Sequence, residues 1–500
     1  MPTSAAPAPT PAVRQSVLAT LKSPRLLKTE VLAGLVVALA LIPEAIAFSV
    51  IAGVDPRMGL FASFTMAVTI SFVGGRPAMI SAATGAVALV IAPVVASHGV
   101  QYLVPTVILA GVLQILLALA GVAKLMRFIP RSVMVGFVNA LAILVFSSQL
   151  PELIGVPWLV YPIVAVGLVI VFGLPRLTTA VPAPLVAIVV LTVAAVAAGW
   201  KIPTVGDKGE LPNSLPALLF PDIPLTLETL QIIAPYAVAM AFVGLLESLL
   251  TAKLVDDITD TRSSKPREAA GQGIANIVTG FFGGMGGCAV VGQTMMNVKA
   301  SGARTRISTF LAGVFLLVLV VVLGDVVALI PMAALVAVMI FVAWAAFDWH
   351  SIRPSTLKRM PRSETAVMLI TVLATVITHN LAIGVGAGVL AAMVLFARRV
   401  AHFVTVQRTV ADDGGMVTYA VQGELFFASS NDLYTQFEYA LDPAEVVIDM
   451  SASHVWDAST VAALDAIAEK YRNRGKTVSI TGLNDSSDAI RSRLSGRLGS

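Results

Sequence analysis

The chain has 500 residues, of which 57% are hydrophobic and 12% charged, with a net charge of +4 and a mean hydropathy of +0.88. Soluble domains carry about a quarter charged residues, so this composition excludes an ordinary soluble protein. The net charge of +4 is small and lies almost wholly on one side of the expected membrane, so it indicates membrane orientation and not nucleic-acid binding. The single cysteine, Cys288, excludes an intramolecular disulfide and a zinc site built on cysteine pairs.

Hydrophobic runs recur throughout residues 31–400, and we assign this region to a transmembrane domain. A bilayer core about 30 Å thick needs roughly 20 helical residues, and the longer runs reach that length. Fourteen segments are expected, of which the third and the tenth are too short to cross alone. The segments are expected to start near Val31, Gly59, Thr84, Leu103, Val133, Trp158, Pro182, Ile232, Ala269, Val290, Ile307, Val327, Thr365 and Ala382.

The basic residues of this region are distributed unequally between its two sides. If the N-terminus is inside, only Arg57, Lys201 and Lys208 fall in outer connections, and the other Lys and Arg residues lie inside. Inner loops of membrane proteins carry such an excess. We therefore expect a multi-pass protein of the bacterial inner (plasma) membrane with both termini in the cytoplasm. Residues 1–30 are expected to form a cytoplasmic tail, because no cleavable signal sequence precedes the first run.

The composition changes after Arg399, and residues 403–500 alternate strand-like and helical segments. Short strands with intervening helices are typical of a small α/β domain. The expected segments are Met416–Phe427, Asn431–Leu441, Val446–Met450, Thr460–Arg472, Val478–Thr481 and Ser486–Leu498.

Two halves of seven segments share one pattern, a single carboxylate inside an apolar helix followed by a small-residue stretch. Thr84 follows Glu44 by 40 residues, and Cys288 follows Glu247 by 41. An odd number of segments inverts the second copy, so the pattern predicts inverted repeats, as in many transporters.

Each small-residue stretch opens a short helix, and the two helix N-termini are predicted to bind an anion. A helix N-terminus presents unpaired N–H groups and about half a positive charge, so it needs no cationic side chain to hold an anion. The alternative is that these small residues only permit close helix packing. The residues concerned are Ala82, Ala83, Thr84 and Gly85 in the first half and Gly287, Cys288, Ala289 and Val290 in the second.

Glu247 is the residue that we expect to couple transport to an ion. An acid at the bilayer centre costs about 3 kcal/mol and is usually functional. A buried carboxyl can exchange a proton near neutral pH, and Thr251 lies one turn further on. Two alternatives stay open: the pair holds Na⁺, or Glu247 is purely structural.

Several of these segments resemble the SulP (sulfate permease) family of anion transporters. The first helix is similar at Pro43–Ser49 and Gly53–Pro56, the eighth at Ala241–Thr251 and the ninth at Gly271–Ile277. Further motifs of this resemblance are Gly280, Phe282–Gly284, Asn297-Val298, Arg304-Thr305, and, in a STAS-like tail, Asp449–Ser451 and Asp457–Ser459.

The resemblance implies an α-helical polytopic protein with seven-plus-seven inverted repeats and a cytoplasmic STAS domain. It implies a core domain of segments 1–4 and 8–11, a gate domain of segments 5–7 and 12–14, and a homodimer. The anion would lie between the third and tenth helices, with Glu44 and Phe48 of the first helix alongside. The chain departs from the family's pattern at Ala82-Ala83-Thr84, where many relatives have Gly-Pro-Thr, and at Gln293, where many have Arg.

These observations predict a secondary active transporter of a small anion: sulfate, bicarbonate or a dicarboxylate. We expect proton-coupled symport by alternating access. Three alternatives remain: Na⁺-coupled anion transport, a nucleobase–cation symporter of the same fold, and a membrane-anchored signalling scaffold. The sequence contains no phosphate-binding loop, catalytic triad or metal-ligand spacing, so neither enzyme activity nor a cofactor is expected.

Overall fold

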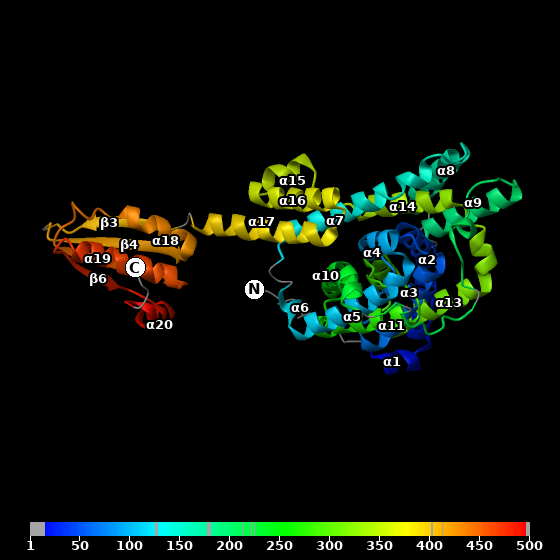
Figure 1. The fold of residues 1–500 in the computed structure, drawn as a ribbon, viewed down its shortest axis with the longest axis horizontal. Helices are drawn as coiled ribbons and strands as arrows, with labels where there is room; N and C mark the ends of the chain where they lie inside the picture. The colour runs from blue at the N-terminus through cyan, green and yellow to red at the C-terminus, as the bar shows by residue number, and fades with distance from the viewer. Residues whose placement is uncertain are drawn as a thin grey trace, which may run out of the picture. The chain divides into compact units, whose positions relative to one another are not determined.

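The computed structural model describes residues 16–125, 129–177, 182–212, 214–221, 223–224, 226–401, 404–412 and 414–496. It divides into two compact units, Met1–Val389 and Leu390–Ser500 (Figure 1). Half of the expected tail, residues 1–15, lies outside the described residues.

The described part of the first unit is almost entirely helical, and each of the fourteen expected segments contains a helix. The first half consists of α1 (Val17–Lys22), α2 (Pro24–Ala52), α3 (Pro56–Val73), β1 (Ser81–Ala82), α4 (Gly85–His98), η1 (Val100–Tyr102), α5 (Leu103–Leu119), α6 (Val122–Leu125), α7 (Arg131–Ser147), η3 (Leu150–Leu153), α8 (Val160–Gly173), η4 (Leu174–Arg176), α9 (Ala183–Ala197) and η5 (Val205–Lys208). The second half consists of α10 (Leu227–Thr259), α11 (Lys265–Phe281), β2 (Cys288–Ala289), α12 (Val291–Met295), the π-helical turn η6 (Met296–Ala300), α13 (Arg306–Ala328), α14 (Met332–Ala346), α15 (Pro354–Arg359), α16 (Arg362–Thr378) and the start of α17 (Leu381–Ala401). The residues of α17 from Leu390 onward belong to the second unit.

Seven helical stretches in the described residues are long and apolar enough to cross a membrane, and four shorter helices are also apolar. The third and tenth segments are short, as predicted: α4 has 14 residues and α12 has five. The predicted start of the twelfth segment near Val327 is wrong. The helix ends before Pro331, where Val205 N donates to Ile330 O and Met332 N donates to Pro203 O. An apolar run that reads as continuous is therefore interrupted by pairing with the loop around residues 203–205.

The helices of the first unit pack in two groups. In one group α13 packs on α2 and α3, while α11 packs on α3 and α5 and α10 packs on α4 and α5. In the other group α14 packs on α7, α8 and α9, and α16 packs on α7. Glycines permit the closest approach, since a Cβ on Gly273 would lie 2.5 Å from Gly111 O. The groups meet where α4 contacts α7 and where α2 contacts α9 and α14.

The second unit contains a four-stranded sheet with the order β3-β4-β5-β6. β3 is antiparallel to β4, and the other neighbours are parallel. The sheet packs on α19 and α20 around a core that includes Tyr419, Ile448 and Leu464. Its elements are β3 (Thr405–Val410), β4 (Met416–Leu425), α18 (Phe427–Leu433), η7 (Tyr434–Gln436), β5 (Glu445–Val455), α19 (Ala458–Arg472), β6 (Thr477–Thr481) and α20 (Asp485–Leu494).

One predicted boundary in this unit is wrong, and one strand of the sheet was not predicted. The helix expected over Asn431–Leu441 begins earlier, at Phe427, and ends at Leu433, because Phe437 and Tyr439 turn into the core. Strand β3 was not predicted, since most of its side chains are exposed and its sequence lacks an alternating apolar face.

Candidate functional site

A short antiparallel strand pair joins the two predicted halves of the site. Ser81 pairs with Ala289 and Ala82 with Cys288, and α4 and α12 begin just after these strands. This pairing brings together two stretches that are more than 200 residues apart in the chain.

Neighbouring helices hold both strands through side-chain oxygens. Ala83 N donates to Ser63 Oγ of α3 at 3.2 Å, and Ala289 N donates to Ser248 Oγ of α10 at 3.0 Å. These bonds satisfy backbone groups that would otherwise be unpaired in an apolar interior. The strands are therefore held in place by polar side chains of the surrounding helices.

Gly287 has no room for a side chain. A Cβ there would lie 2.1 Å from Ala82 O, far inside van der Waals contact. The Asn276 side chain of α11 forms hydrogen bonds with both backbone polar groups of this glycine. Gly287 N donates to Asn276 Oδ1 at 2.9 Å, and Asn276 Nδ2 donates to Gly287 O at 3.0 Å. The sequence motif around Asn276 supported the family resemblance but did not reveal this contact.

The first turn of α4 is capped and enclosed. The Thr84 side chain accepts a hydrogen bond from Val87 N at 3.3 Å, a common N-cap arrangement. A Cβ on Gly85 would lie 2.9 Å from the Phe48 ring and 3.2 Å from Val145 Cγ2 of α7. Phe48 therefore lies against the helix start, as expected from the resemblance, together with a side chain from the other helix group.

Two polar contacts of the Cys288 thiol link the side chains of Glu247 and Thr84. Cys288 Sγ lies 3.0 Å from Glu247 Oε2 and 3.1 Å from Thr84 Oγ1. All three side chains are buried. Thr251 donates its hydroxyl hydrogen to Glu247 O at 2.8 Å, within its own helix. The arrangement connects the acid of α10 to the N-cap of α4.

The first turn of α12 adjoins open space. Val291 is 39% exposed, and no atom lies within 4 Å of a Cβ built on Gly292. The next residue, Gln293, interacts with the carboxyl group of Glu44, which is half-buried in α2. Sequence reasoning placed Glu44 at the site but gave Gln293 no role in it.

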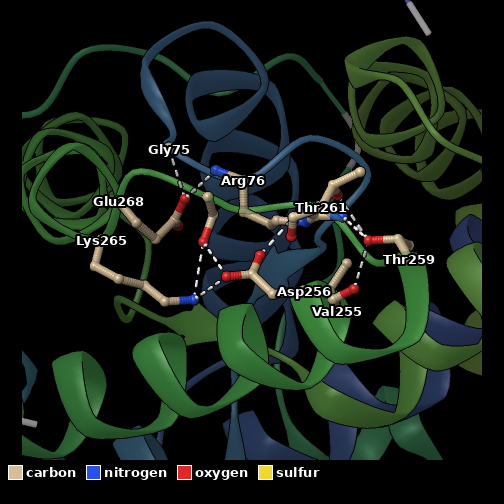
Figure 2. A network of polar contacts seen from close by, with 9 residues as sticks. Gly75, Arg76, Val255, Asp256, Thr259, Thr261, Lys265 and Glu268 are labelled. Atoms are coloured by element: carbon tan, nitrogen blue, oxygen red, sulfur yellow. Dashed lines mark hydrogen bonds and ion pairs between the residues drawn. The ribbon is translucent and has the colours of Figure 1, made fainter. Parts of the chain in front are cut away.

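A larger network of hydrogen bonds and ion pairs connects the loop before strand β1 to α10 and α11 (Figure 2). Glu268 Oε2 accepts from Gly75 N at 2.7 Å and from Arg76 N at 2.8 Å. The Arg76 side chain pairs with Asp256 of α10 at 3.0 Å, and Lys265 Nζ lies 2.8 Å from the other oxygen of Asp256. Gln272 donates to Glu268 and to Ser81 of β1. The loop before the strand is therefore tied to both α10 and α11.

Comparison with known proteins identifies the family. The model of the sulfate permease family matches residues 27–161 and 158–371, and the model of the STAS domain matches residues 407–494. The chain therefore belongs to the sulfate permease family, which comprises membrane-embedded transporters and not enzymes, and its C-terminal unit is a STAS domain.

Individual relatives cover nearly the whole chain. YbaR of Bacillus subtilis, named only as a candidate sulfate transporter, is 53% identical over 94% of this chain and 97% of its own length. The bicarbonate transporter BicA of Picosynechococcus is 26% identical over 92% of this chain and 89% of its own length.

Solved structures agree with this assignment. The transmembrane domain of a cyanobacterial BicA matches with a TM-score of 0.63 at 25% identity, covering 74% of this chain and 98% of that domain. The murine anion transporter Slc26a9 in its inward-facing state matches with a TM-score of 0.81, covering 93% of this chain and 87% of that one. Its 17% identity shows a shared fold.

Proposed function

We propose that this protein is a secondary active transporter that carries a small anion together with protons. The observation that carries this proposal is the contact of Cys288 with both Glu247 and Thr84, at 3.0 and 3.1 Å. It joins the single mid-helix acid of α10 to the cap of a helix whose N-terminus suits an anion. The names of the relatives favour sulfate or bicarbonate as the anion, and a dicarboxylate remains a candidate.

The anion would bind between the starts of α4 and α12. The first-turn N–H groups of a helix have no acceptor within that helix, and two such turns would share one anion. Ala82, Ala83, Thr84 and Gly85 would line one side, with Phe48 and Glu44 beside them. Gly287, Cys288, Ala289 and Val290 would line the other side, next to the open space at Gly292.

A proton suits Glu247 better than Na⁺ does. Hard cations such as Na⁺ prefer several oxygen ligands, whereas the group next to the carboxylate is the sulfur of Cys288, 3.0 Å away. A buried carboxyl with one weak S–H donor is suited to gain and lose a proton during a transport cycle.

Alternating access would move one helix group past the other. We assign α2–α5 and α10–α13 to a core domain that carries the anion, and α7–α9, α14, α16 and α17 to a gate domain. The separate packing of these two groups supports this division. We further propose a homodimer in the bacterial inner membrane, with residues 1–30 and the STAS domain, residues 403–500, in the cytoplasm.

The proposal is tested by uptake into proteoliposomes that contain the purified full chain. Labelled sulfate, bicarbonate and a dicarboxylate are supplied with and without an inward proton gradient, and a Na⁺ gradient is applied in a parallel arm. Labelled uracil tests the nucleobase alternative, and protein-free liposomes are the control. We expect at least one anion to accumulate faster with the proton gradient. Uptake that responds only to Na⁺, or uptake of uracil and of no anion, would contradict it.

A further inference from the structure

Glu44 and Gln293 form a second carboxyl group with a polar neighbour, separate from the contact between Glu247 and Cys288. The Gln293 side chain interacts with the Glu44 carboxyl group. Gln293 is only 2% exposed, and its Oε1 atom has no hydrogen-bond partner. A buried amide oxygen without a donor is costly, and it calls for a hydrogen that some other group supplies.

A protonated Glu44 would supply that hydrogen. An ionised carboxylate only accepts hydrogen bonds, whereas a protonated carboxyl group also offers one O–H donor. With a proton on Glu44, the O–H group satisfies Gln293 Oε1. The side-chain N–H groups of Gln293 are then free to point toward an anion at the open turn of α12.

No cation lies in the middle of the helices around Glu44 to balance its charge. In the described elements that pack on α2, every titratable side chain stands in the first or last turn of its element. In α2 itself, Arg25 and Lys28 lie in the first two turns, and the other titratable residues of this helix are Glu30 and Glu44. Glu30 accepts hydrogen bonds from the backbone N–H groups of Arg304, Thr305 and Ser308. The titratable residues of the packed elements are Lys22 of α1, Arg57 of α3, His98 of α4, Lys299 of η6, and Arg306 and Asp325 of α13; α9, α12 and α14 contribute none.

We propose that Glu44 is a second proton-binding residue of this transporter, and that an anion binds next to Gln293 only when Glu44 is protonated. The inference rests on the proposed function, since it assumes an anion at the turns of α4 and α12. Two negative charges a few ångströms apart in a site of low polarity repel each other strongly, so binding of the anion draws a proton onto Glu44. Two protons, on Glu44 and Glu247, then accompany each anion.

Calorimetric titration of the purified full chain tests the inference. Sulfate, oxalate and bicarbonate are the probes, and titrations in buffers of different ionisation enthalpy count the protons taken up with each anion. We expect wild type to take up about two protons per anion, Glu44→Gln and Glu247→Gln about one each, and the double variant none. Glu228→Gln, at an exposed acid in the first turn of α10, is the matched control and should behave as wild type.

A second variant keeps the inference testable if Glu44→Gln does not fold. Gln293→Lys places a cation beside Glu44, so the carboxylate stays ionised and proton uptake falls by about one per anion. Because the number of protons taken up sets the slope of log affinity against pH, sulfate affinity of this variant should fall by up to about tenfold per pH unit between about pH 6 and about pH 9, whereas wild-type affinity should fall more steeply, by up to about hundredfold per pH unit. Unchanged proton uptake in both folded variants would overturn the role of Glu44 and leave the proposed function standing. Wild-type protein that binds none of the three anions would overturn both.

Discussion

The Cys288 thiol lies between two residues from different helices, 3.0 Å from Glu247 Oε2 and 3.1 Å from Thr84 Oγ1. A thiol has one hydrogen to donate, so donation to the carboxylate leaves sulfur to accept from the threonine hydroxyl. A change of charge on Glu247 therefore reaches the N-cap of α4 through one intermediate side chain. If Glu247 carries the coupled proton, as we propose, this relationship is a short physical route from that proton to the proposed anion site.

The first prediction concerns Glu247→Gln. The amide keeps the size of the side chain but cannot bind a proton, so uptake should continue or slow without any response to an inward proton gradient. Initial uptake rates in proteoliposomes with and without the gradient measure this. Glu228→Gln should keep the wild-type response. A variant that is accelerated by external acid as strongly as wild type would rule out Glu247 as the proton carrier.

The second prediction uses the free space at Gly292. Gly292→Val adds bulk where no atom lies within 4 Å, so the fold should tolerate it while the side chain obstructs the proposed anion position. Loss of one charge-assisted hydrogen bond, about 1.5–3 kcal/mol, predicts at least about tenfold weaker apparent affinity. Gly386→Val in α17 has equally open surroundings and is the control. Normal affinity in folded Gly292→Val protein would contradict a site at this turn.

The third prediction concerns an ion-paired loop on the side that we propose is external. Lys208 of η5 lies 2.8 Å from Glu152 of η3, and the next part of this loop joins α3 through Glu210 and Arg57. Alternating access would require the loop and the gate group to separate. A short thiol crosslinker in the variant Glu152→Cys with Lys208→Cys should therefore stop uptake, and cleavage of the crosslink should restore it.

The native Cys288 is buried, so it is shielded from the reagent in this experiment. The pair Arg57→Cys with Glu210→Cys is the control, because it links the loop to a core helix only. Uptake that continues at full rate after complete crosslinking of positions 152 and 208 would argue against movement between these elements.

The fourth prediction concerns the stability of the STAS domain at alkaline pH. Burial raises the pKa of Tyr439 to about 12, and burial with the hydrogen bond to Asp442 raises the pKa of Tyr471. Both hydroxyls are therefore neutral in the fold at a pH where the unfolded chain ionises them. Their contribution to stability is complete below about pH 10 and is lost as pH rises through the folded-state pKa values.

Residues 403–500 expressed alone should be soluble and fold cooperatively, and the melting temperature should fall steeply above about pH 10. Tyr439→Phe should reduce this alkaline loss. Asp442→Ala should destabilise the domain at neutral pH by about 2–4 kcal/mol, because the fully buried Asp442 side chain accepts from Tyr419, Tyr471 and Arg408. A fragment that remains unfolded in isolation would contradict an independent domain.

The sequence by itself determined the order of the helices, the shortness of the third and tenth segments and the positions of Glu44 and Glu247. Hydrophobicity carries this information residue by residue, because a bilayer requires long apolar helices and makes each buried acid conspicuous. Motifs such as Gly271–Ile277 added the family. The break at Pro331 shows the limit of such reading, since an apolar run alone does not show where a loop from elsewhere in the chain will pair.

The tertiary structure alone decided which residues meet. The pairing of Ser81–Ala82 with Cys288–Ala289, the contact of Cys288 with Glu247, and the serines that hold Ala83 and Ala289 all join distant parts of the chain. The hydrophobic pattern of a single helix shows that a polar residue is buried, but it does not show which group forms a hydrogen bond with that residue. That partner is chosen by the packing of helices around it, and the same packing places Gln293 against Glu44.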